Sequence, residues 1–278
     1  MIKTLVQLSD PHIKAPGSLA YGRVDTAACL ERAVAAVARL DPAPTAVVVS
    51  GDLCDFGRAD EYAHLRRLLA PLACPVHLLP GNHDDRRELR RAFADHAELQ
   101  RPGDDDGWFD YAVDLGGLRL VVADTVVPGA SQGELCAGRL AALAARLDAD
   151  AQAPTIVAMH HPPFATGIRH MDAIGLLQGA DALADLIRRR PQVEAVVCGH
   201  LHRSIQRRWA GTLALTAPST AHQVCFDLRD DGPSAWALEP PGFMVHAWSD
   251  GPGVVSHVVP VGEFDGPHPF HAEGALID

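Results

Sequence analysis

Five apolar runs in this sequence end in side chains that bind metal ions or transfer protons. The side chains are carboxylates, one carboxamide and imidazoles. They belong to Asp10 and His12, Asp52, Asn82 and His83, His160 and His161, and His200 and His202. Imidazole nitrogen and carboxylate oxygen are common ligands of divalent transition metals, so this combination of residue types indicates metal-dependent chemistry.

The apolar runs are predicted to be buried strands, because continuous runs of this kind are typical of parallel strands covered on both faces. They comprise residues 4–9, 46–49, 76–79, 155–159 and 193–198. Helical periodicity predicts helices over residues 26–40, 59–70, 133–147 and 181–189. This alternation indicates an α/β fold. Sites in open α/β sheets lie beyond the carboxyl ends of the strands, so we expect the five strand ends to converge on one pocket.

The rest of the chain predicts a second sheet. Residues 111–114 and 118–123 flank Leu115, Gly116 and Gly117, a pattern typical of an antiparallel hairpin. Residues 167–179 are expected to form a loop. Beyond residue 203, short apolar runs are separated by Pro and Gly, with no helix signal. We therefore assign residues 1–205 to a catalytic core and residues 206–278 to a β-rich C-terminal part that completes the second sheet and forms a lid or an oligomer contact.

Seven side chains at the strand ends are candidate metal ligands. They are Asp10, His12, Asp52, Asn82, His160, His200 and His202. This number exceeds the needs of one tetrahedral ion and suits two ions with a bridging carboxylate. Nitrogen and oxygen ligands without thiolate favour Mn, Fe, Co or Zn over Ca or Mg, without selecting one of them. Adjacent side chains on an extended segment point in opposite directions, so only one of His160 and His161 is expected to join the ions.

Composition narrows the class of partner. The formal charge of −11 disfavours a nucleic-acid groove, which needs clustered Lys and Arg. The arginine clusters at residues 86–91 and 188–190 are interpreted as solvated helix surface. Six cysteines without a CxxC pair, no apolar run long enough to span a membrane and no separable signal peptide indicate a cytoplasmic protein. Open strand edges in the C-terminal part predict a homo-oligomer.

The motifs together resemble the calcineurin-like metallophosphoesterases. The family pattern D-x-H, GD, GNH[DE], H and GHxH is matched in order. The matching residues are Asp10-Pro11-His12, Gly51-Asp52, Gly81-Asn82-His83-Asp84, His160, and Gly199-His200-Leu201-His202. The similarity extends to the class III cyclic-nucleotide and glycerophosphodiester phosphodiesterase branch. It does so through Tyr21-Gly22 with Asp25, the segments VVVSGD, LLPGNHDD and MHHPP, His170-Met171-Asp172, and Thr220-Ala221-His222-Gln223.

The resemblance implies a four-layer sandwich of two mixed β-sheets flanked by helices. It also implies two metal sites, with Asp52 as the bridging ligand. The first site comprises Asp10, His12, Asp52 and His202, and the second comprises Asp52, Asn82, His160 and His200. A metal-activated hydroxide would attack phosphorus, and catalytic His83 would orient the phosphoryl oxygens or protonate the leaving group. Asn82, His83, His161 and His222 are the expected substrate contacts.

The function indicated is hydrolysis of small phosphodiesters, and three alternatives remain. A phosphomonoesterase or protein phosphatase of the same superfamily typically carries Arg after the second Asp of the GD block and Glu after GNH. Here the segments continue as Leu53-Cys54-Asp55-Phe56-Gly57 and as Asp84. A nuclease is disfavoured by the acidic charge, and a metal-stabilised binding protein by the complete ligand set. The choice between cyclic nucleotides and glycerophosphodiesters stays open.

Overall fold

The computed structural model describes residues 2–101, 103, 106–272, 275 and 276. The helices are α1 (Thr26–Ala38), α2 (Ala59–Leu69), α3 (Arg86–Ala92), the 3₁₀ helix η1 (Ala97–Leu99), α4 (Ala137–Asp148), α5 (Arg169–Asp172) and α6 (Ala180–Arg188). The strands are β1 (Lys3–Leu8), β2 (Ala46–Ser50), β3 (Val76–Leu79), β4 (Tyr111–Asp114), β5 (Arg119–Val122), β6 (Gly133–Glu134), β7 (Thr155–Met159), β8 (Leu176–Gln178), β9 (Val193–Cys198), β10 (Ile205–Trp209), β11 (Thr212–Thr216), β12 (Gln223–Val224), β13 (Trp236–Ala237), β14 (Gly242–Ser249), β15 (Gly253–Pro260), β16 (His271–Ala272) and β17 (Ala275–Leu276).

Two large mixed sheets form the centre of the molecule. The first has the order β15-β14-β1-β2-β3, in which β1, β2 and β3 are parallel and β14 and β15 are antiparallel. The second has the order β10-β11-β9-β7-β5-β4, with parallel strands in the middle and an antiparallel strand at each edge. The predicted hairpin is β4 and β5, and the prediction of two sheets is confirmed.

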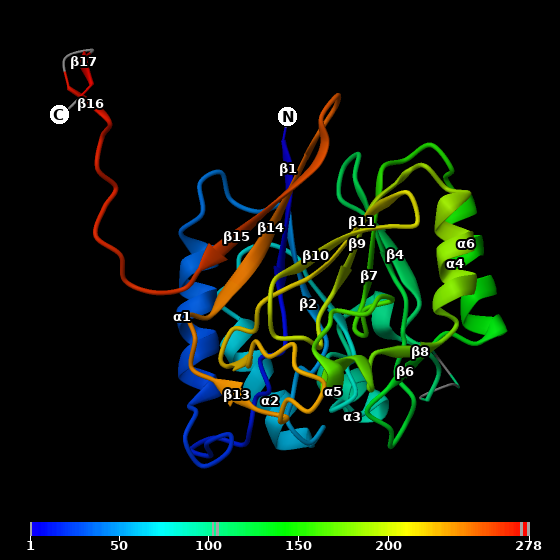
Figure 1. The fold of residues 1–278 in the computed structure, drawn as a ribbon, viewed down its shortest axis with the longest axis horizontal. Helices are drawn as coiled ribbons and strands as arrows, with labels where there is room; N and C mark the ends of the chain where they lie inside the picture. Colours follow the sequence, from blue (N-terminus) through cyan, green and yellow to red (C-terminus); the bar gives the residue numbers. More distant parts are fainter. Residues whose placement is uncertain (1, 102, 104–105, 273–274, 277–278) are drawn as a thin grey trace.

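Helices cover the outer faces of both sheets (Figure 1). Helix α1 begins after Asp25, whose carboxylate accepts a hydrogen bond from Ala28 N, and it packs Leu30 and Val34 into the core of the first sheet. Helices α1 and α2 lie on that sheet, whereas α4 and α6 lie on the second. Strands β2 and β7 are buried along their whole length because they are covered on both faces. The four-layer sandwich is therefore confirmed.

Two predicted segments differ in the structure. The helix expected over residues 133–147 begins only at Ala137, because Gly133 and Glu134 form β6. The loop expected over residues 167–179 contains α5 and β8. Strands β6 and β8 pair in parallel, so the backbone groups of both segments are satisfied by each other rather than by local helix or loop structure.

Two of the four arginines of α3 were wrongly interpreted as solvated surface, whereas Arg87 and Arg91 are exposed as predicted. Arg86 and Arg90 are 8% and 4% exposed. Arg86 Nε and Nη2 donate to the Asp124 carboxylate over 2.8 and 2.9 Å, and Arg90 lies over the Phe109 ring. These partners are distant in sequence, so the charge pattern of the helix alone could not indicate burial.

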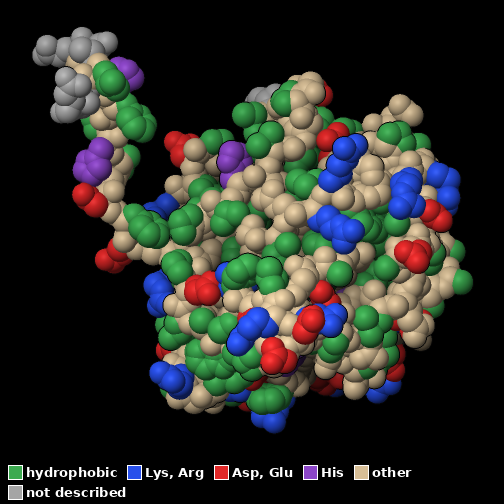
Figure 2. Space-filling view, viewed as in Figure 1, with side chains coloured by type: hydrophobic (Ala, Val, Ile, Leu, Met, Phe, Trp, Pro, Cys, Tyr) green, Lys and Arg blue, Asp and Glu red, His purple; other side chains and the backbone are tan. Residues whose placement is uncertain are grey.

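The C-terminal part contributes to both sheets and not only to the second. Strands β14 and β15 extend the first sheet, while β10 and β11 extend the second. The antiparallel pair β12 and β13 forms a small ribbon of its own. Beyond residue 261 the chain leaves the body as an arm, described over residues 262–272, which carries exposed apolar side chains (Figure 2). None of the helices in the described residues is long and apolar enough to cross a membrane.

Candidate metal site

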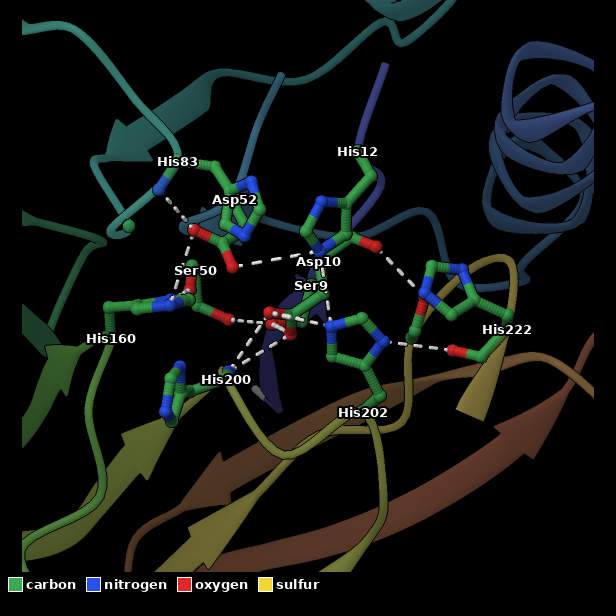
Figure 3. Close-up of polar contacts among 12 residues, drawn as sticks. Ser9, Asp10, His12, Ser50, Asp52, His83, His160, His200, His202 and His222 are labelled. Atoms are coloured by element: carbon green, nitrogen blue, oxygen red, sulfur yellow. Dashed lines mark hydrogen bonds and ion pairs between the residues drawn. The ribbon is translucent and has the colours of Figure 1, made fainter. Parts of the chain in front are cut away.

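The predicted ligands lie together where five strands end (Figure 3). Residues after β1, β2 and β3 in the first sheet face residues after β7 and β9 in the second. A cavity of about 390 Å³ opens onto this cluster. Its lining includes His12, Asp52, Asn82, His200 and His202. A larger groove of about 470 Å³ lies between α2 and α3 and is lined by none of the predicted site residues.

The first donor group consists of Asp10, His12, Asp52 and His202, all buried. His12 Nε2 lies 3.1 Å from His202 Nε2 and 3.6 Å from Asp52 Oδ2. His202 Nε2 lies 3.5 Å from Asp10 Oδ1. Two imidazole nitrogens and two carboxylate oxygens that converge in this way match the donors expected around a transition-metal ion.

The second donor group meets the other oxygen of Asp52. His160 Nε2 lies 3.4 Å from Asp52 Oδ1 and 3.1 Å from Asn82 Oδ1. His200 Nε2 is buried and makes no hydrogen bond with the described residues. Asp52 thus directs one carboxylate oxygen toward each donor group, which is the arrangement of a bridging ligand.

Hydrogen bonds from the outer ring nitrogens orient two of the histidines. His160 Nδ1 donates to Ser50 O over 2.9 Å, and His202 Nδ1 donates to His222 O over 3.0 Å. A carbonyl oxygen only accepts, so both Nδ1 atoms carry a proton, and in each ring Nε2 is the atom directed at the cluster. Metal-binding histidines are commonly held in this way, and the residues present therefore fit bound metal.

The loops that carry the ligands have an uncommon backbone conformation. Positive φ angles occur at seven non-glycine positions in the described residues, and five belong to the candidate ligands. These five are Asp10, His12, Asp52, His200 and His202. Positive φ is unfavourable for residues with a side chain and is tolerated at functional sites when the surrounding structure enforces it.

Close packing and one carboxylate hold these loops in place. A Cβ atom at Gly81 would lie 2.2 Å from Asp52 Oδ1, so only glycine fits at that position. Asp84 accepts hydrogen bonds from the backbone N–H groups of Gly81, Leu53 and Cys54. The loops after β2 and β3 are therefore tied together, which fixes the separation of Asp52 and Asn82.

Burial and neighbouring charge shift the ionisation of the cluster. Burial raises the pKa of Asp10 to about 6 and lowers the pKa of His202 to about 3. Burial opposes ionisation of Asp52 and His160 as well, but their mutual attraction prevails. It holds the pKa of Asp52 well below its usual range and raises the pKa of His160 to about 9. A metal cation would replace the proton as the partner of these donors.

His83 lies beside the first donor group without joining either one. Its ring stands edge-on to His12 at 4.7 Å, and its side chain is 39% exposed. His83 Nδ1 donates to Asp55 O over 2.9 Å, so Nε2 is the ring atom left to exchange a proton with a ligand in the cavity. This placement agrees with a role near the substrate.

His161 is buried next to His160 and His200 and is not among the residues that line the cavity. Its side chain is fully buried, and both ring nitrogens have partners. Nδ1 is 2.8 Å from Thr125 Oγ1, and Nε2 donates to Ser131 O over 3.1 Å. His161 therefore contacts Ser131, which lines the cavity, and its role as a substrate contact stays a prediction.

The cavity wall combines residues named in the sequence analysis, His222 and Tyr21, with two that were not recognised, Ser131 and Trp236. His222 lines the cavity as expected, and Tyr21 Oη lies 3.4 Å from its Nε2. Trp236 stacks on Tyr21 at 5.0 Å, although the two residues come from opposite ends of the chain. Neither Ser131 nor Trp236 belongs to a recognisable motif at the end of an apolar run. No sequence signal therefore marked them.

Comparison with known proteins supports one family. A family model described as calcineurin-like phosphoesterase matches residues 3–204. A probable glycerophosphodiester phosphodiesterase GpdQ of Arcobacter nitrofigilis is 35% identical over 275 residues, covering 99% of both chains. The 3',5'-cyclic adenosine monophosphate phosphodiesterase CpdA of Pseudomonas aeruginosa is 36% identical over 219 residues, covering 79% of this chain and 76% of the relative.

Solved structures share the fold. A dimetal phosphatase from Danio rerio has a TM-score of 0.61 at 16% identity, covering 94% of this chain and 99% of that chain. At this identity the similarity establishes the fold alone. The family model and the relatives, which span most or all of the chain, show that the chain belongs to the calcineurin-like phosphoesterase family.

Proposed function

We propose that this chain is a dinuclear metal-dependent phosphodiesterase that hydrolyses small phosphodiesters. The observation that carries the proposal is the pair of donor groups that share Asp52 at the floor of one cavity. The names of the relatives, a glycerophosphodiester phosphodiesterase and a cyclic adenosine monophosphate phosphodiesterase, support a diester as the substrate class.

The residues divide between two metal ions that share one ligand. The first ion would be held by Asp10, His12, Asp52 and His202. The second would be held by Asp52, Asn82, His160 and His200. The donor types favour Mn, Fe, Co or Zn. When bound, such ions supply Lewis acidity and an activated water.

The cavity residues would position the diester and its leaving group. His83 lines the cavity and its Nδ1 is held by Asp55 O, so the remaining ring nitrogen, Nε2, can donate a proton to the departing oxygen or a hydrogen bond to a phosphoryl oxygen. His222 and Tyr21 form the neighbouring wall.

Diesters should be better substrates than monoesters. No Lys or Arg lines the cavity in the described residues, so the second negative charge of a monoester finds no cationic side chain there. We expect kcat/KM for bis(nitrophenyl) phosphate to exceed that for nitrophenyl phosphate with the manganese-loaded protein. The reverse preference would indicate a phosphatase, and no turnover of either would indicate a non-catalytic binding protein. Cyclic AMP and glycerophosphoethanolamine compared as substrates would then identify the natural diester class.

Self-association is proposed through the arm. Phe264 and Phe270 on the arm are 66% and 79% exposed, and the edge strand β15 exposes Val255 and Val258. Apolar side chains on an extended arm and an open sheet edge are both stabilised when a second copy of this chain covers them.

Deleting residues 262–278 should therefore lower the mass that light scattering measures at micromolar concentration. The double variant Phe264→Ser with Phe270→Ser keeps the length of the arm and should have the same effect. A monomeric intact protein, or truncated and intact proteins of the same oligomeric state, would refute the role of the arm.

A further inference from the structure

A row of polar side chains, all buried except the half-buried Ser256 at its outer end, runs through the core between the two sheets and ends at Asp10. His246 on β14 accepts at one end from Ser256 on β15 and contacts Gln7 on β1. The row continues through Ser50 and Ser9 to the Asp10 carboxylate. Its successive distances are 2.8 Å (Ser256 Oγ to His246 Nδ1), 3.1 Å (His246 Nε2 to Gln7 Oε1), 2.8 Å (Gln7 Nε2 to Ser50 Oγ), 2.7 Å (Ser50 Oγ to Ser9 Oγ) and 2.5 Å (Ser9 Oγ to Asp10 Oδ2).

All hydrogen bonds in this row point the same way. Gln7 Nε2 also contacts Cys198 O over 2.9 Å, and since a carbonyl only accepts, this atom is the amide nitrogen. Gln7 Oε1 therefore faces His246, whose Nε2 must carry the proton. His246 Nδ1 then accepts from the Ser256 hydroxyl. From Ser256 to Asp10, each group accepts from the previous one and donates to the next.

Burying these polar side chains costs free energy, so we expect the row to have a specific role. Gln7, Ser9, Ser50 and His246 are each 0% exposed. They lie in the main apolar core, with Met244 and Val197 among its members. Burial lowers the pKa of His246 to about 4, so the ring is neutral near pH 7. Buried polar groups are tolerated when all are satisfied, and consecutive hydrogen bonds of one direction strengthen one another.

The inner end of the row sets the orientation of one metal ligand (Figure 3). Ser9 Oγ donates to Asp10 Oδ2. The backbone N–H of His200 lies 2.9 Å from Asp10 Oδ1 and 3.1 Å from Oδ2. Asp10 Oδ1 is the oxygen that faces His202 Nε2. The carboxylate is thereby fixed with one oxygen toward the row and the other toward the first donor group.

We infer that this hydrogen-bond chain positions Asp10 as a metal ligand and that His246 is a positioning residue for the first metal site. The inference rests on the proposed metal centre. It implies that removing a side chain from β14, in the interior of the first sheet, weakens metal binding at the site between the sheets. Outer partners of metal ligands typically contribute about 10- to 100-fold in metal affinity.

The test is a calorimetric titration of the metal-free protein with Mn²⁺. His246→Leu should weaken one of two binding steps, because Asp10 belongs to only one donor group. The loss should be about 10-fold, the lower end of the range for a direct outer partner, because three residues lie between His246 and Asp10. His246→Gln retains an N–H donor toward Gln7 and should recover most of the lost affinity. Ser50→Ala deletes a single hydroxyl in the middle of the chain, and it provides the same test if His246→Leu fails to fold.

A matched control separates positioning from stability. His77 is another buried histidine of the first sheet, and its Nδ1 contacts Glu98 Oε1 over 3.0 Å, away from the metal site. His77→Leu should lower Tm without changing Mn²⁺ affinity. The inference is overturned if His246→Leu and Ser50→Ala both bind Mn²⁺ as the wild-type protein does. A wild-type protein that binds fewer than two Mn²⁺ ions would instead refute the proposed centre.

Discussion

Replacing Asp52 by Ala should weaken the binding of both metal ions at once. Asp52 Oδ2 faces His12 in one donor group, and Asp52 Oδ1 faces His160 in the other. Elemental analysis of the manganese-loaded variant after desalting should show fewer than two ions. Diesterase activity should fall by more than about 10²-fold, because even an outer partner of a metal ligand contributes 10- to 100-fold.

Two further variants define the cause of that loss. Asp52→Asn keeps the shape of the side chain and removes its charge, so it should also bind metal more weakly. Asp25→Ala removes a carboxylate that caps α1 outside the site. It should cost about 1 kcal/mol of stability and leave metal content unchanged. Retention of both ions by Asp52→Ala would refute the bridging role.

Replacing His83 by Ala should reduce kcat while the protein keeps its metal. His83 contributes its side chain to the cavity but lies outside both donor groups. Loss of a positioned acid or of a transition-state hydrogen-bond donor typically costs about 10²- to 10⁴-fold in rate. Steady-state kinetics together with elemental analysis would measure both quantities in one preparation.

The leaving group distinguishes the two roles of His83. If His83 acts as an acid, the defect should be smaller for nitrophenyl esters, whose leaving group needs no proton, than for alkyl esters. An equal defect for both would assign His83 to stabilising phosphoryl charge. His64→Ala is the control, since His64 lies on α2 and its Nδ1 contacts Lys14 O outside the cavity. A loss of metal from His83→Ala would contradict the placement of His83 beyond the donor groups.

Much of the fold and the site could be predicted because the informative signals are local. Strands β1, β2, β3, β7 and β9 are mainly apolar runs, and the candidate ligands follow within a few residues of the end of each. Asp10, Asp52 and His160 therefore point to the same edge of the sheets once the α/β alternation is recognised. The N-cap residue Asp25 is likewise a local signal, because it lies directly before the helix that it caps.

The remaining features depend on partners far apart in sequence. His161 resembles its neighbour His160, and only its contacts with Thr125 and Ser131 show that it braces a loop. In the sequence Arg86 has the pattern of a surface charge, and only its ion pair with Asp124 in the structure shows that it is buried. The polar row through His246 joins residues near both ends of the chain, so no local pattern could reveal it.

Two metal ions are expected to flank Asp52. Anomalous scattering from crystals of the manganese-loaded protein tests this arrangement directly. Two manganese peaks are expected, one among Asp10, His12 and His202 and the other among Asn82, His160 and His200, with Asp52 between them. A single peak, or peaks away from Asp52, would contradict the proposed dinuclear centre.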